Sequence, residues 1–107
     1  MRIAIVGGLD RAARELEDIA RARGHQLEVH TGTIAGPASS ASLRALVARA
    51  ELVIVLTDIN SHNGVRMARR QARISRRPVR LLRRLGPSQF EALVRALGTA
   101  TALPSCI

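Results

Sequence analysis

Four short apolar runs recur along the chain and predict four β-strands. Residues 2–6 and 52–56 are almost wholly apolar and rich in β-branched side chains, which is typical of strands covered on both faces. Residues 26–30 and 79–82 mix polar and apolar side chains, which is typical of half-exposed strands. We therefore predict a sheet with two central strands and two edge strands.

The segments between these runs carry apolar residues at helical spacing. The first predicted helix ends before Gly24, and the second follows a loop at residues 31–40 that is rich in Gly, Ser, Thr and Pro. The third is capped by Asn60 or Ser61, and the fourth ends at Gly98.

This alternation of strands and helices predicts a single three-layer α/β domain. Right-handed crossovers make the four-stranded sheet parallel, and placing the two apolar strands in the centre gives the order 2-1-3-4, a Rossmann-like or flavodoxin-like arrangement with helices on both faces. Residues 1–99 form this domain, and residues 100–107 are a C-terminal tail that carries Cys106 as a free thiol. The chain changes direction between the two central strands, so their carboxyl ends form the expected ligand crevice.

The composition supports one domain in water. A chain of 107 residues can bury one core but not two, and 47% hydrophobic with 23% charged residues excludes a disordered composition. No apolar run approaches the roughly 20 residues that cross a bilayer, and no signal peptide precedes the first strand. We therefore expect a cytoplasmic protein with no membrane partner.

Arginine alone supplies the net charge of +9, because the sequence contains no lysine. No acidic residue occurs between Asn60 and Phe90, so this stretch could attract nucleic acid or an acidic partner, although a solvated helix face would look the same. Phe90 is the only aromatic residue, so bases have no stacking partner and nucleic acid is the less favoured ligand. Arg66, Arg69 or Arg70, Arg73 and Arg77 follow helical spacing, and Arg76, Arg80, Arg83 and Arg84 complete the stretch.

The strongest candidate for a functional site is the polar stretch at residues 57–63, directly after a buried strand. Six of its seven side chains are polar, whereas a turn and a helix cap need only one or two. Capping explains Asn60 or Ser61, and the amides at the helix start could hold an anionic group oriented by the nearby hydroxyls, including that of Thr57. Capping does not explain the others, which are Asp58, His62 and Asn63.

Two further features lie at the same predicted edge. Gly7 and Gly8 follow the first strand and resemble a phosphate-binding turn, in which backbone amides meet an anion. The full dinucleotide and P-loop motifs are missing, and an ordinary tight strand-to-helix turn would look the same and is the favoured interpretation. Arg83 or Arg84, at the end of the last strand, could anchor an anionic ligand.

A metal site is the alternative use of this edge. His30, at the end of the second strand, could join Asp58 and His62, since two imidazoles and a carboxylate are typical transition-metal ligands. No metal-binding spacing motif accompanies them, and the cofactor stays unknown. Ser61 and His62 do not suit nucleophilic catalysis, because neighbouring residues at a helix start do not face each other.

Four segments of the chain resemble a small bacterial family that carries only a domain-of-unknown-function label. The motif Thr-Asp-x-x-Ser-His is the most specific element, whereas the last segment departs from the more serine-rich version of the family. The resemblance implies an α/β fold and a site that includes Gly32, but no reaction. The segments are Ile5–Gly8, His30–Gly32, the pairs Thr57–Asp58 and Ser61–His62, and Leu82–Phe90.

These observations lead to three hypotheses about function. We favour a binding or regulatory domain, not an enzyme, that holds a small anionic ligand or nucleotide at the carboxyl edge of the sheet. A metal-dependent or nucleotide-processing enzyme is the second, and an arginine-rich adaptor for nucleic acid or an acidic partner is the third. Exposed sheet edges are consistent with a homodimer. The candidate ligand-binding residues are Gly7, Gly8, His30, Gly32, Thr57, Asp58, Asn60, Ser61, His62, Asn63, Arg83 and Arg84.

Overall fold

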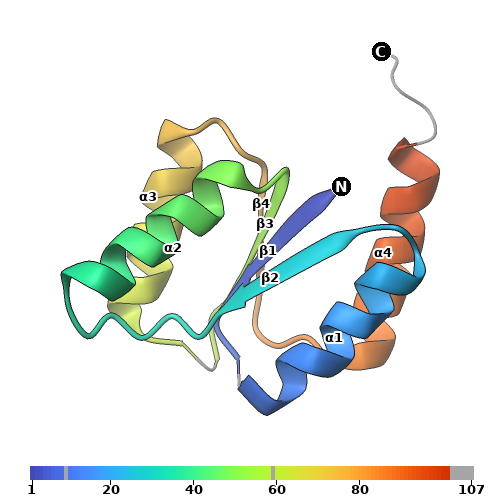
Figure 1. The fold of residues 1–107 in the computed structure, drawn as a ribbon, viewed down its shortest axis with the longest axis horizontal. Coiled ribbons are helices and arrows are strands. Elements are labelled where there is room, and N and C mark those ends of the chain that lie inside the picture. The colour runs from blue at the N-terminus through green and yellow to red at the C-terminus, as the bar shows by residue number, and fades with distance from the viewer. Residues whose placement is uncertain (9, 59, 102–107) are drawn as a thin grey trace.

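The chain alternates strictly between strands and helices (Figure 1). The computed structural model describes residues 1–8, 10–58 and 60–101. No helix in this described part is both long and apolar enough to cross a membrane. The strands are β1 (Arg2–Val6), β2 (Gln26–His30), β3 (Leu52–Leu56) and β4 (Val79–Leu82), and the helices are α1 (Asp10–Ala22), α2 (Pro37–Arg49), α3 (His62–Ile74) and α4 (Pro87–Thr101).

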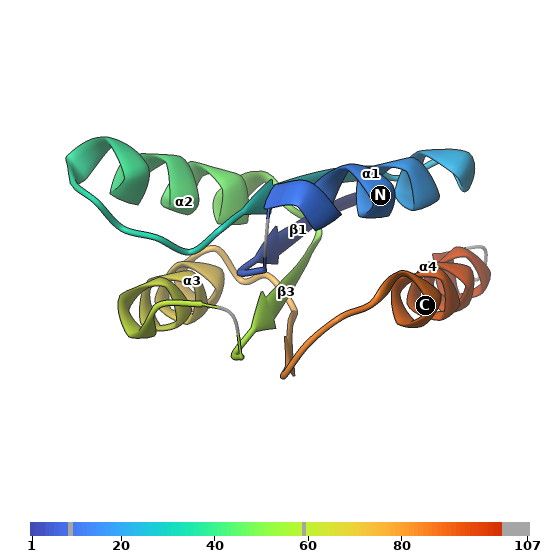
Figure 2. The same cartoon turned by 90° about the horizontal axis from the view of Figure 1, so that it is seen from below.

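The four strands form one parallel sheet in the order β2-β1-β3-β4, which confirms the predicted topology. Val6 at the end of β1 is in register with His30 of β2 and with Val55 of β3, and Leu56 is in register with Leu82 of β4. The carboxyl ends of all four strands therefore lie in one row. Figures 1 and 2 show α2 and α3 on one face of the sheet and α1 and α4 on the other.

Each face of the sheet has its own core, because successive side chains of a strand point to opposite faces. Val6 and Val55 belong to the core that packs against α2 and α3. Ile5 and Ile54 belong to the core that packs against α1 and α4, together with the fully buried Phe90. β1 and β3 are thus covered on both faces, as their apolar sequences predicted.

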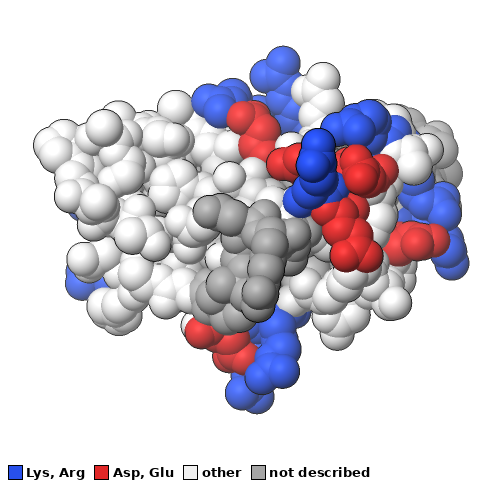
Figure 3. Space-filling model, turned by 60° about the horizontal axis from the view of Figure 1, so that its bottom comes forward, with Lys and Arg blue, Asp and Glu red and all other residues white. Residues whose placement is uncertain are grey.

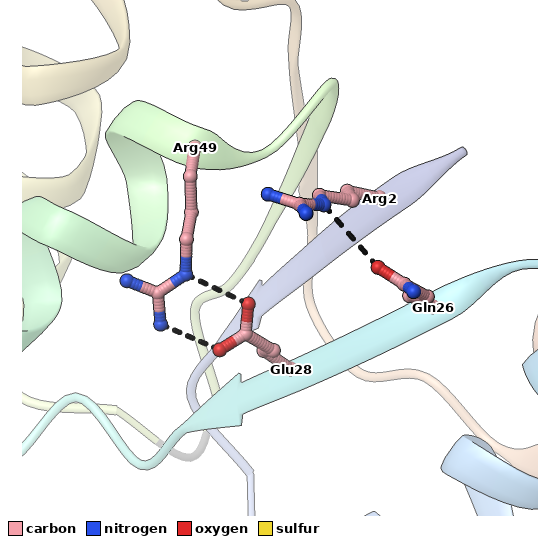
Figure 4. A network of polar contacts seen from close by, with 4 residues as sticks. All are labelled: Arg2, Gln26, Glu28 and Arg49. Carbon is pink, nitrogen blue, oxygen red and sulfur yellow. Dashed lines mark hydrogen bonds and ion pairs between the residues drawn. The ribbon is translucent and has the colours of Figure 1, made fainter.

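β2 is an edge strand whose polar side chains bind neighbouring elements. Arg49 at the end of α2 donates through Nε to Glu28 Oε1 at 2.9 Å and through Nη2 to the second carboxylate oxygen (Figure 4). On β1, Arg2 Nε donates to Gln26 Oε1 at 3.2 Å. The hydrogen bonds from Arg49 lower the pKa of the Glu28 carboxyl. The polar positions of β2 therefore have a structural explanation.

α2 begins earlier than predicted, at Pro37 inside the expected loop at residues 31–40. Proline is favoured in the first turn of a helix, where its missing amide hydrogen is not needed. Ser39 Oγ then accepts hydrogen bonds from the amides of Ala35 at 2.9 Å and Gly36 at 3.1 Å. The composition of this segment is typical of a loop, but its proline and serine start a helix.

α4 extends beyond the predicted end at Gly98 and continues to Thr101. A glycine inside a helix costs only about 1 kcal/mol relative to alanine, so Gly98 alone does not end it. The predicted tail at residues 100–107 therefore overlaps the helix at its start. Residues 102–107, including Cys106, lie outside the described part of the chain.

Candidate functional site

Backbone hydrogen bonds continue past the ends of the strands and join the segments that follow them. The Gly7 amide donates to the carbonyl of His30 at 2.7 Å, and the Asp58 amide donates to the carbonyl of Arg83 at 2.9 Å. These bonds join the segment after β1 to the end of β2 and the segments after β3 and β4 to each other, along what we call the carboxyl edge. The Gly7 amide is used in this pairing and is not left for an anion.

Asn60 joins the two central strands at this edge. Its side-chain Nδ2 donates to the carbonyl of Val6 at 3.1 Å and to that of Leu56 at 2.7 Å. Its Oδ1 accepts from the Ser61 amide at 2.8 Å. Because β1 and β3 border the predicted crevice, Asn60 lies where a ligand was expected, and its three hydrogen bonds give it a structural role.

Ser61 caps α3, as predicted, and also fixes the loop after β2. Its Oγ accepts from the Gly64 amide at 2.9 Å and donates to the Gly32 carbonyl at 2.6 Å. A serine cap of this kind stabilises a helix by about 1 kcal/mol. The second hydrogen bond adds a connection between segments 29 residues apart.

Gly32 and Gly64 allow the backbone to approach Asn60 closely. Gly32 has a φ of +88°, and a Cβ there would lie 1.8 Å from Asn60 Oδ1. A Cβ on Gly64 would lie 2.3 Å from the Gly32 carbonyl oxygen. His30 supports the same loop, because its Nδ1 accepts from the Gly32 amide at 2.9 Å. We call Gly32, Asn60, Ser61 and Gly64 the Asn60 junction.

Asp58 pairs with both arginines that follow β4. Arg84 Nε donates to Asp58 Oδ2 at 3.0 Å, and Arg83 Nε lies 3.5 Å from Asp58 Oδ1. The hydrogen bond from Arg84 and the charges of both arginines lower the pKa of the Asp58 carboxyl. One carboxylate faces two guanidinium groups, so the cluster keeps one positive charge. Both guanidinium side chains are more than 80% exposed and can meet a ligand from solvent.

A small pocket lies beside these arginines, on the face of the sheet that α1 and α4 cover. Its volume is about 110 Å³. Gly8 lies in its lining with a φ of +91°, and a Cβ there would contact Leu56 Cδ1 at 3.4 Å. The pocket combines an apolar wall with two cationic side chains, and we call it the carboxyl-edge pocket. Its lining residues are Ile5, Gly7, Gly8, Ala13, Leu16, Val29, Leu56, Arg83, Arg84 and Leu85.

None of the polar residues described at positions 57–63 lines this pocket, and Asp58 only pairs with the two arginines that do. Thr57 and His62 are exposed, and Asn63 faces a different hollow on α3. Ile59 lies outside the described residues. Among the side chains that the structure describes, no three of His, Cys, Asp or Glu are grouped so that they could hold a metal ion. The expected set of His30, Asp58 and His62 is therefore not assembled.

The larger hollow, of about 860 Å³, lies along α3 and reaches α2. We call it the α3 groove. Arg77 was predicted to continue the arginine stripe, but this is wrong, because its Nε and Nη2 donate to the Ala48 carbonyl at 3.1 and 2.8 Å, near the end of α2. The arginines of the α3 groove are Arg66, Arg69, Arg70 and Arg73 of α3 and Arg44 of α2.

Some residues of these sites were missed in the sequence. Gly64 is buried three positions after the Ser61 cap, and a glycine inside a helical pattern was an available signal for close packing. Arg44 lies on a different helix from the other arginines of the α3 groove, so no spacing could reveal it. Leu85 follows Arg84 and lines the carboxyl-edge pocket, which the apolar pattern alone does not indicate.

The extent of the fold agrees with a comparison against known families. A family model described as "Uncharacterized protein conserved in bacteria (DUF2325)" matches residues 2–97, a range that includes all four strands. No curated protein and no solved structure matches the chain. The chain therefore belongs to the DUF2325 family of uncharacterized bacterial proteins.

Proposed function

We propose that this domain binds a small anionic molecule at the carboxyl-edge pocket. The observation that carries the proposal is the lining of the pocket, where an apolar wall adjoins Arg83 and Arg84. Ligands of open α/β sheets bind outside the carboxyl ends of the strands, which is where this pocket lies. A compact apolar group would lie against Ile5 and Leu56, and an anionic group would pair with the arginines.

The charges at the pocket favour an anion over a neutral ligand. Arg83 and Arg84 outnumber Asp58, which is the acidic residue paired with them. Guanidinium groups bind phosphate and carboxylate through two parallel hydrogen bonds, which fixes the orientation of the ligand. Asp58 holds the arginines in place and also lowers their attraction for a second anion.

The size of the pocket favours a small molecule over a whole nucleotide. Typical ligand pockets have volumes of roughly 300–1,000 Å³, whereas the carboxyl-edge pocket has about 110 Å³. A nucleotide would be enclosed only in part. We therefore propose a compact apolar body with one phosphate or carboxylate.

Binding is a better proposal than catalysis, because the polar side chains of the region already form hydrogen bonds with the protein backbone. Ser61 Oγ is bonded to Gly32 and Gly64, and the Asn60 amide is bonded to two strand carbonyls. Neither group is positioned to act as a nucleophile or to polarise a substrate. The geometry supports a domain that senses or carries an anion.

The experiment is a calorimetric titration with phenyl phosphate, which combines an apolar ring with a phosphate. We expect Arg84→Gln to weaken binding by roughly three- to tenfold, since it removes a charge-assisted hydrogen bond from an exposed position. Arg80→Gln is the matched control, because Arg80 is an exposed arginine of β4 that does not line the pocket.

Phenol is the neutral control ligand, and we expect its binding to be much weaker than that of phenyl phosphate. Equal losses in Arg84→Gln and Arg80→Gln would show that overall charge, not the pocket, holds the anion. Absence of phenyl phosphate binding at millimolar concentration would contradict the proposal.

A further inference from the structure

α1 and α3 are surface helices of equal length, 13 residues each, but their charges differ in kind. The sequence of α1 contains four acidic residues and three arginines, whereas that of α3 contains four arginines and no acidic residue. Figure 3 shows acidic and basic side chains next to one another over α1. A helix that only faces solvent is stabilised by charges of both signs. α3 departs from this pattern.

The arginines of the α3 groove also have no acidic partner within the described part of the chain. The arginines that form ion pairs in the described part of the chain are Arg21, Arg23, Arg49, Arg83, Arg84 and Arg95. Arg44, Arg66, Arg69, Arg70 and Arg73 are absent from these pairs, and all five are exposed. Like charges that crowd one surface repel each other, and a bound polyanion would remove that repulsion.

The spacing of these arginines suits a regular row of phosphates. An α-helix rises about 1.5 Å per residue, so Arg66 and Arg73 lie roughly 10 Å apart along the axis of α3. Each strand of a nucleic-acid duplex presents one phosphate per 3.4 Å or so of its axis, and the distance from Arg66 to Arg73 therefore spans about three phosphates. Asn63 and Gln71 also line the groove and add uncharged amides of the kind that bind phosphate and sugar oxygens.

We propose that the α3 groove binds the phosphate backbone of double-stranded nucleic acid. A single strand is disfavoured because its binding sites stack bases on exposed aromatic rings, and Phe90, the sole aromatic residue, is fully buried. An acidic polypeptide is disfavoured because such partners need apolar anchors. Ile34 and Met67 are partly buried against the core, which leaves Ile74, 66% exposed, as the one exposed anchor of the groove in the described chain.

The binding follows from shape and charge alone, without recognition of base sequence. It uses a surface separate from the carboxyl-edge pocket and does not depend on the function proposed above. The guanidinium groups of the α3 arginines would contact successive phosphates, and Arg44 would approach from α2.

The test is fluorescence anisotropy with labelled DNA and RNA duplexes of about 20 base pairs in a series of salt concentrations. We expect Arg69→Gln/Arg73→Gln to weaken binding at least tenfold at low salt. Each lost phosphate contact should also reduce the slope of log K against log salt by about 0.9. The matched control is Arg14→Gln/Arg21→Gln on α1, which removes the same charge from exposed positions and should change binding less than twofold.

The proposal is supported if either duplex binds and the α3 double variant loses more affinity than the α1 double variant. The duplex that binds more tightly would identify the preferred helical form. Equal losses in both double variants would show that net charge alone attracts the duplex and would overturn it. Tighter binding of poly-glutamate than of either duplex would assign the groove to an acidic polypeptide instead. Circular dichroism of each variant confirms that its fold is retained.

Discussion

The two sides of the carboxyl edge are built from different loops and differ in how they are filled. On the side of α2 and α3, the Asn60 junction closes the space between strand ends with hydrogen bonds to backbone carbonyls. On the side of α1 and α4, a pocket of about 110 Å³ stays open beside Arg83 and Arg84. The first side holds the sheet and the loops together, and the second is where we propose that a ligand binds.

This difference shows that a high density of polar residues is not by itself a sign of a binding site. Within residues 57–63, Asn60 and Ser61 bind backbone groups, whereas Asp58 binds the arginines after β4. His62 is exposed, and its side chain forms no hydrogen bond or ion pair with the residues that the structure describes. No described residue of this loop lines the carboxyl-edge pocket, and Asp58 is connected to it only through its ion pairs with Arg83 and Arg84.

The largest expected effect comes from crowding the Asn60 junction. Gly32→Ala would place Cβ 1.8 Å from Asn60 Oδ1, so Asn60 must move and lose its hydrogen bonds. We expect a loss of about 4 kcal/mol in the free energy of unfolding, from steric overlap and broken hydrogen bonds together. Urea denaturation followed by circular dichroism measures this value.

Gly24→Ala is the matched control for that variant. Gly24 has a similar φ of +79°, but nothing lies within 4 Å of its Cβ position. It should lose only the roughly 1–2 kcal/mol of left-handed backbone strain. If the two variants are equally stable, the junction is not tightly packed.

A smaller effect is expected when the Asn60 side chain is removed. Asn60→Ala leaves the carbonyls of Val6 and Leu56 without their side-chain donor, which should cost about 2–3 kcal/mol. Asn63→Ala is the control, because Asn63 is exposed, and its loss should stay below about 0.5 kcal/mol. Similar unfolding midpoints for the two variants would show that the hydrogen bonds of Asn60 do not stabilise the fold.

The smallest effect on stability is expected at Asp58, and it should depend on pH. Because the arginines lower the pKa of Asp58 in the folded state, the ion pair stabilises the fold above the unfolded pKa of about 4, and this contribution is lost as pH falls through the folded pKa. The melting temperature of Asp58→Asn should therefore be slightly lower than that of the wild type at pH 7. Near pH 2 the two proteins should have the same melting temperature. A difference that persists at pH 2 would require another cause.

Asp58→Asn should also affect ligand binding in the opposite direction to Arg84→Gln. Removing the carboxylate leaves both guanidinium groups free of their acidic partner. We expect phenyl phosphate to bind a few-fold more tightly, since a repelling charge beside the ligand is lost. Weaker binding would mean that Asp58 is needed to position the arginines.

The sequence predicted the fold well, because its signals are local. Apolar runs marked all four strands with their observed bounds, and their polarity gave the order of the sheet. The start of α2 at Pro37 and the passage of α4 through Gly98 were missed, since proline and glycine have more than one structural use.

The contacts of the candidate site residues were predicted only in part. Ser61 could be recognised as a cap because capping depends on neighbours in sequence. The hydrogen bond from Asn60 to Val6 joins residues 54 positions apart, and the one from Arg77 to Ala48 joins residues 29 apart. Such contacts depend on the assembled tertiary structure, so no local pattern reveals them.

The most direct test of the account is a titration of isotopically labelled protein with phenyl phosphate, followed through backbone amide chemical shifts. We expect the largest shifts at Gly8, Arg84 and Leu85, which line the carboxyl-edge pocket, and little change at Gly32 and Gly64 of the Asn60 junction. Shifts confined to the junction, or to the arginines of the α3 groove, would contradict the claim that the open side of the carboxyl edge is the anion site.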